Sequence, residues 1–140
     1  MLEQGAREAS ALRLGQDHEV YIVMACQDRL ETEQVGQELL KVNSGRLQAY
    51  RRIRDLICNP PTGPITSAIL ATHDGQAEVT EALEWIRRQW PRCLTIVIGD
   101  TGCGRQERMA RQGGALFLTR PVSAEQWLAI VCHASGDNLL

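Results

Sequence analysis

Four short apolar runs, separated by segments with helical spacing, constrain the fold of this chain more than any other feature. The runs are VYIVMAC (20–26), SAILAT (67–72), LTIVIGD (94–100) and ALFLT (115–119). They are rich in Val, Ile and Leu and nearly continuous rather than alternating, which is typical of strands covered on both faces. The alternation of strand and helix therefore predicts a single doubly wound α/β domain, with a mostly parallel sheet flanked by helices.

Capping signals mark the ends of the helical segments. Asp28 and Glu31 open the first helix as a predicted capping pair. Pro91 ends the helix that carries Trp90, and Ser123 opens the last one. The buried stripe of that last helix consists of Trp127, Ile130, Val131 and Ala134.

Residues 45–64 fit a strand or a helix equally in their apolar spacing. We expect a short strand near 46–50, which brings the sheet to five strands, and then a helix that ends at Cys58. The domain is thus expected to cover residues 18–134, between a loose leader (1–17) and a tail (135–140).

Composition excludes several classes of function. A net charge of -2 argues against direct contact with nucleic acid, which needs a basic excess, and no apolar run is long enough to cross a membrane. The cysteines are odd in number and lack the spacing of zinc ligands, so we expect no metal or other cofactor and a reducing, cytoplasmic setting. They are Cys26, Cys58, Cys93, Cys103 and Cys132.

The stretch GGALFLTRPVSAEQW (113–127) resembles the last strand and helix of response-regulator receiver domains, where a Gly-Ala pair, an aromatic residue and Lys-Pro share this arrangement. WIRRQWPRCLTIVIGD (85–100) resembles the third helix and fourth strand of that family, and EVYIVMACQDR (19–29) stands where its first strand would be. The resemblance covers most of residues 18–134. It implies a flavodoxin-like, receiver-type fold and a role in bacterial two-component signal transduction or transcription control.

The phosphorylation pocket of a receiver would be degenerate here. The resemblance places Met24, Ala25 and Cys26 where acidic residues should hold magnesium, which prefers oxygen ligands. The remaining pocket positions are Thr72 for the phosphate-accepting aspartate, Gly99 for the hydroxyl residue and Arg120 for the lysine, while Phe117 and Pro121 match the switch aromatic and the proline. The resemblance thus implies a pseudo-receiver. Such a domain has no catalytic residue, so we expect that this chain is not an enzyme.

Arg120 would lack most of the anionic neighbours that the family provides. An unpaired cation is costly to bury, so we expect its side chain to reach solvent or to pair with Asp28, Asp74 or Asp100. The resemblance also implies a cis peptide bond between Arg120 and Pro121.

We expect a phosphorylation-independent regulatory domain that acts through protein contacts or dimerisation, with an effector domain attached or separate. The resemblance puts the contact face on the last two helices and the strand between them, with Arg105, Arg108 and the edge of Trp127. Two alternatives remain. One is a residual switch that binds magnesium and accepts phosphate at Asp74, and the other is a flavodoxin-like binder of a small ligand at the strand ends.

Overall fold

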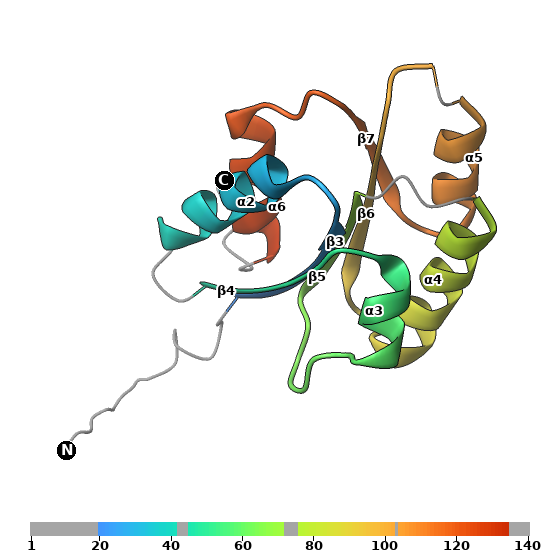
Figure 1. Ribbon diagram of the computed structural model, residues 1–140, viewed down its shortest axis with the longest axis horizontal. Helices are drawn as coiled ribbons and strands as arrows, with labels where there is room; N and C mark the ends of the chain where they lie inside the picture. The colour runs from blue at the N-terminus through green and yellow to red at the C-terminus, as the bar shows by residue number, and fades with distance from the viewer. Residues whose placement is uncertain (1–19, 42–44, 72–75, 103, 135–140) are drawn as a thin grey trace.

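The sheet has five strands that all run in the same direction (Figure 1). The structure, a computed structural model, describes residues 20–41, 45–71, 76–102 and 104–134. The strand order is β4-β3-β5-β6-β7. The strands are β3 (Val20–Cys26), β4 (Gly45–Tyr50), β5 (Ser67–Ala71), β6 (Leu94–Gly99) and β7 (Leu116–Thr119). The doubly wound α/β prediction is confirmed, and β4 is the short strand expected near 46–50.

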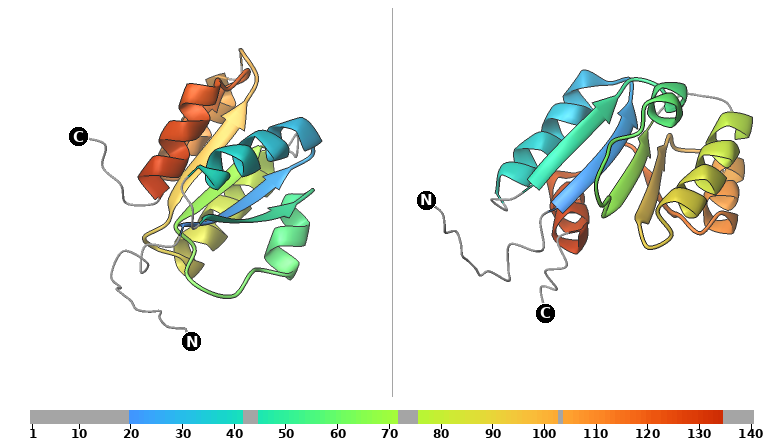
Figure 2. Two further views of the ribbon diagram at one scale, coloured as in Figure 1. Left: turned by 90° about the vertical axis from the view of Figure 1, so that its left-hand side faces the viewer. Right: turned by 90° about the horizontal axis from the view of Figure 1, so that it is seen from below.

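In the part of the chain that the structure describes, five helices cover the two faces of the sheet. Helices α2 (Arg29–Leu40) and α6 (Ala124–Ala134) lie on one face. Helices α3 (Ile53–Cys58), α4 (Gln76–Gln89) and α5 (Gly104–Gln112) lie on the other, as Figure 2 shows. The sheet is therefore the middle of three layers. In the described ranges, no helix combines the length and the apolar character needed to span a membrane.

The continuous apolar runs supply both layers of the core at once. Successive strand side chains point to opposite faces, so alternate residues pack under different helices. In β3, Ile22 and Met24 pack toward α2 and α6, whereas Val23 and Ala25 pack toward α3 and α4. Burial on both faces is the physical reason that the strands show no polar alternation.

The helix starts show which capping predictions hold. At α6, Gln126 N donates to Ser123 Oγ at 3.1 Å and Ser123 N donates to Gln126 Oε1 at 2.9 Å, which is a complete capping box. At α2, Asp28 Oδ1 accepts from Leu30 N at 2.9 Å. The expected contribution of Glu31 to that cap is wrong, because its carboxylate is bonded to Arg120 instead.

Candidate functional site

Parallel strands end at one edge of the sheet, and this edge gathers most of the positions singled out in the sequence. Cys26 pairs in register with Ala71, and Gly99 pairs with Thr119, which immediately precedes Arg120. The Arg120–Pro121 bond is cis, as expected. Thr72 and Asp74 lie outside the described residues, and so does Cys103.

Arg120 and Glu31 form an ion pair at this edge with two hydrogen bonds. Arg120 Nε donates to Glu31 Oε2 at 2.7 Å, and Arg120 Nη2 donates to Glu31 Oε1 at 3.2 Å. The side chains are only 17% and 11% exposed, respectively. The planar guanidinium matches both carboxylate oxygens at once, a geometry that the ammonium group of a lysine cannot provide.

Arg120 is held by three further bonds. Its Nη2 also donates to the carbonyl oxygen of Ala71 at 2.8 Å, and its Nη1 lies 3.4 Å from Asp100 Oδ1. Its backbone N–H donates to Gly99 O at 2.8 Å. Of the three partners expected from the sequence, Asp100 is found as a minor one and Asp28 caps α2, while Asp74 lies outside the described residues. The principal partner, Glu31, was missed.

Electrostatics favour the charged form of Arg120. Burial lowers the pKa of its guanidinium, but hydrogen bonding and charge attraction from Glu31, with a smaller contribution from Asp100, more than offset burial and leave the pKa raised. Arg120, for which the sequence indicated few anionic neighbours, is therefore paired with carboxylates in the folded protein.

Cys26 completes the surroundings of Glu31. Its Sγ lies 3.4 Å from Glu31 Oε1 and 3.3 Å from the backbone oxygen of Asp28. The pKa of the thiol is raised to about 11, and burial is the largest cause of this shift. At neutral pH, the thiol of Cys26 is thus protonated and can donate to the Glu31 carboxylate.

Gly99 and Phe117 lie against each other on neighbouring strands. A Cβ added at Gly99 would lie 2.5 Å from Gln106 Oε1 and 2.9 Å from Phe117 Cζ. The Gln106 side chain and the Phe117 ring together therefore occupy the space that a hydroxyl-bearing side chain would need at this position. The resemblance pointed to Gly99 and Phe117 separately. It did not indicate that the Phe117 ring leaves no room for a larger residue at position 99.

The described strand ends do not fit a magnesium site. Met24 and Ala25 are fully buried and offer no carboxylate, and Cys26 offers sulfur. Mg²⁺ requires oxygen ligands in near-octahedral geometry. Both Glu31 and Asp100 have their carboxylates turned to Arg120. Within the described ranges, no group of three or more His, Cys, Asp or Glu side chains could hold a metal ion.

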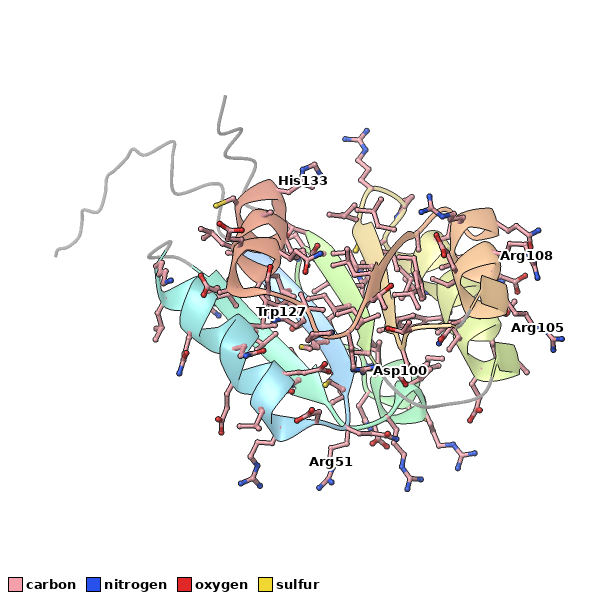
Figure 3. All side chains as sticks on the ribbon, turned by 90° about the horizontal axis from the view of Figure 1, so that it is seen from above. Arg51, Asp100, Arg105, Arg108, Trp127 and His133 are labelled. Carbon is pink, nitrogen blue, oxygen red and sulfur yellow. The ribbon has the colours of Figure 1, made fainter. Side chains whose placement is uncertain are left out.

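The expected contact residues divide into two groups. Arg105 and Arg108 are exposed on α5 and point away from the body of the protein (Figure 3). Trp127 is only 1% exposed, and its Nε1 donates to Gln34 Oε1 on α2 at 3.1 Å. The expectation that Trp127 takes part in a surface contact is wrong, because the packing of α6 against α2 encloses the indole.

An apolar groove runs between α6 and strands β6 and β7. Its lining is almost entirely aliphatic, with Gln126 and His133 at the rim. The aliphatic side chains include Leu94, Leu116, Leu118 and Ile130. Leu116, on edge strand β7, is 52% exposed. Exposed apolar surface rimmed by polar groups commonly marks an interaction site.

No protein-family model matches the sequence, and no curated protein matches it. Solved structures do resemble it. The beryllofluoride-activated receiver domain of DrrB, from Thermotoga maritima, superposes with a TM-score of 0.69 and 17% identity, over 82% of this chain and 96% of that one. A CheY-like receiver domain protein of Methanospirillum hungatei gives a TM-score of 0.71 and 14% identity, over 84% and 94%.

A third similar structure is the beryllofluoride-activated receiver domain dimer of NtrC4. It gives a TM-score of 0.69 and 18% identity, over 84% of this chain and 97% of that one. At such low identity, these likenesses establish that the chain has the receiver-type, flavodoxin-like fold. Whether the strand ends of this chain can bind a metal ion or accept a phosphoryl group depends on the residues that this chain carries there.

Proposed function

We propose that this chain is a receiver-like domain that works in bacterial signal transduction or transcription control through protein contacts, without phosphorylation and without catalysis. The observation that carries this proposal is the Arg120–Glu31 pair. It lies at the strand ends, where a receiver would need free carboxylates and a free cation. A phosphoryl transfer depends almost entirely on positioning and charge neutralisation. A cleft whose charges neutralise each other internally offers little of either.

The proposed contact face comprises α5, β7 and α6, and its occupant is a second copy of this chain. The apolar groove supplies an aliphatic surface beside the exposed Leu116. Arg105 and Arg108 on α5 are basic, whereas Glu125 on α6 is an exposed acid. In an isologous contact, each copy offers the same surface, so the α5 arginines of one copy can face Glu125 of the other. The NtrC4 receiver, similar in fold, is a dimer in its beryllofluoride-activated form.

Sedimentation equilibrium, with and without beryllofluoride and Mg²⁺, tests both parts of the proposal. We expect a dimer whose dissociation constant changes by less than about twofold on addition of the phosphate mimic. Leu116→Glu should weaken the dimer at least about tenfold, because it places a charge in an apolar contact. Leu40→Glu is the matched control, because Leu40 is 79% exposed on α2, away from the proposed face.

Three outcomes would count against the proposal. A chain that dimerises only when beryllofluoride and Mg²⁺ are present would indicate a phospho-accepting switch, and Asp74→Asn would then abolish the response. A monomer under both conditions would remove the proposed face. Equal weakening by Leu116→Glu and Leu40→Glu would also contradict the assignment of the contact to β7.

A further inference from the structure

A second cleft lies at the carboxyl edge of the sheet, beside the Arg120–Glu31 pair and separated from it by Cys26. It is formed between the first turn of α2 and the end of β4, with Gln27, Thr32 and Tyr50 among its lining residues. Arg29, in the first turn of α2, and Arg51, directly after β4, are also among its lining residues. Arg51 projects outward from this edge of the protein (Figure 3).

The acids nearest to this cleft in sequence are Asp28, Glu31, Glu33 and Asp55. The Asp28 carboxylate caps α2, and the Glu31 carboxylate is held by Arg120. In the part of the chain that the structure describes, neither Arg29 nor Arg51 forms an ion pair with a carboxylate. Two exposed cations that line one cleft repel each other, and an anion between them removes that repulsion.

The size and chemistry of the cleft indicate the class of ligand. Its volume is about 260 Å³, somewhat below the roughly 300–1,000 Å³ of sites for drug-sized molecules. Guanidinium groups match the oxygens of phosphate with two parallel hydrogen bonds. Ligands of open parallel sheets bind outside the carboxyl ends of the strands, which is where this cleft lies.

We propose that Arg29 and Arg51 hold the phosphate or diphosphate group of a small ligand in this cleft. Its remaining atoms would extend from the open side. The site is distinct from the α5–β7–α6 face and from the Arg120–Glu31 pair. Binding here would give the domain a chemical input that does not require covalent phosphorylation.

The test follows backbone amide shifts by NMR during titration with inorganic pyrophosphate, with ionic strength held constant by sodium chloride. We expect saturable shifts centred on residues 27–32 and 49–52. The double variant Arg29→Gln/Arg51→Gln should raise the dissociation constant at least about tenfold. The matched control Arg88→Gln/Arg92→Gln removes two exposed arginines from the end of α4 and the turn that follows it, and should change the dissociation constant by less than about twofold.

Several results would overturn this proposal. One is a set of shifts that grow linearly without saturation, and another is equal loss of binding in the control variant. Tighter binding of a ten-residue polyglutamate peptide than of pyrophosphate would assign the cleft to an acidic protein segment instead. Because the titration does not depend on dimerisation or on Mg²⁺, its failure would leave the proposed function standing.

Discussion

Replacing Arg120 by methionine is expected to lower the free energy of unfolding by about 3 kcal/mol, because it leaves the largely buried Glu31 carboxylate without its counter-charge. It also removes the guanidinium bond to the Ala71 carbonyl. Glu31→Met should cost a similar amount, because it leaves the guanidinium largely unpaired. Urea denaturation at neutral pH provides the measurement.

The double variant Glu31→Met/Arg120→Met separates the value of the pair from the cost of breaking it. A buried ion pair replaced by apolar side chains of similar volume often costs little or nothing, so the double variant should lie within about 1 kcal/mol of the parent protein. Arg111→Met is the control, because its ion pair with Glu107 is exposed and should contribute less than about 1 kcal/mol. Single variants at Glu31 and Arg120 that cost no more than Arg111→Met would contradict this account.

Trp127→Ala is expected to destabilise the fold by about 4 kcal/mol, because it removes the largest fully buried side chain between α6 and the sheet. Trp127→Phe keeps most of the apolar volume and loses the indole N–H bond to Gln34, so it should cost about 1 kcal/mol more than the volume change alone.

Urea denaturation measures these differences, with Trp85→Ala as the control. Trp85 is only half-buried and packs edge-to-face against Trp90, so its removal leaves a smaller cavity. A smaller loss for Trp127→Ala than for Trp85→Ala would contradict the enclosed position of Trp127.

Much of the fold could be predicted from the sequence, because local patterns carry it. The apolar runs gave four strands, since burial on both faces removes polar residues from them. The reciprocal hydrogen bonds of Ser123 and Gln126 join residues that are close in sequence, so a local pattern was enough to predict them. Even the ambiguous segment at 45–58 folds as expected, with Leu47 in the sheet and Ile53 and Leu56 buried from α3.

The parts that could not be predicted depend on distant residues. Glu31 and Arg120 are separated by 89 positions, and a local capping pattern offered Glu31 another role. The buried guanidinium provides a stronger partner than a backbone N–H, so the long-range pair prevails. A carboxylate in the first turn of the helix after β3, close to the strand ends, was the signal that could have indicated it. The resemblance placed the edge of Trp127 at a contact face, whereas helix spacing assigned Trp127 to the buried stripe of the last helix, and the structure confirms that assignment.

The measurement that tests the central claim most directly is paramagnetic broadening of backbone amides by Mn²⁺, a substitute for Mg²⁺ with the same preference for oxygen ligands. We expect no selective broadening at residues 25–26 and 99–100 at Mn²⁺ concentrations that saturate ordinary carboxylate sites, because the carboxylates of Glu31 and Asp100 are paired with Arg120. Selective, saturable broadening at these amides would show that the strand ends hold a divalent cation and would contradict the account.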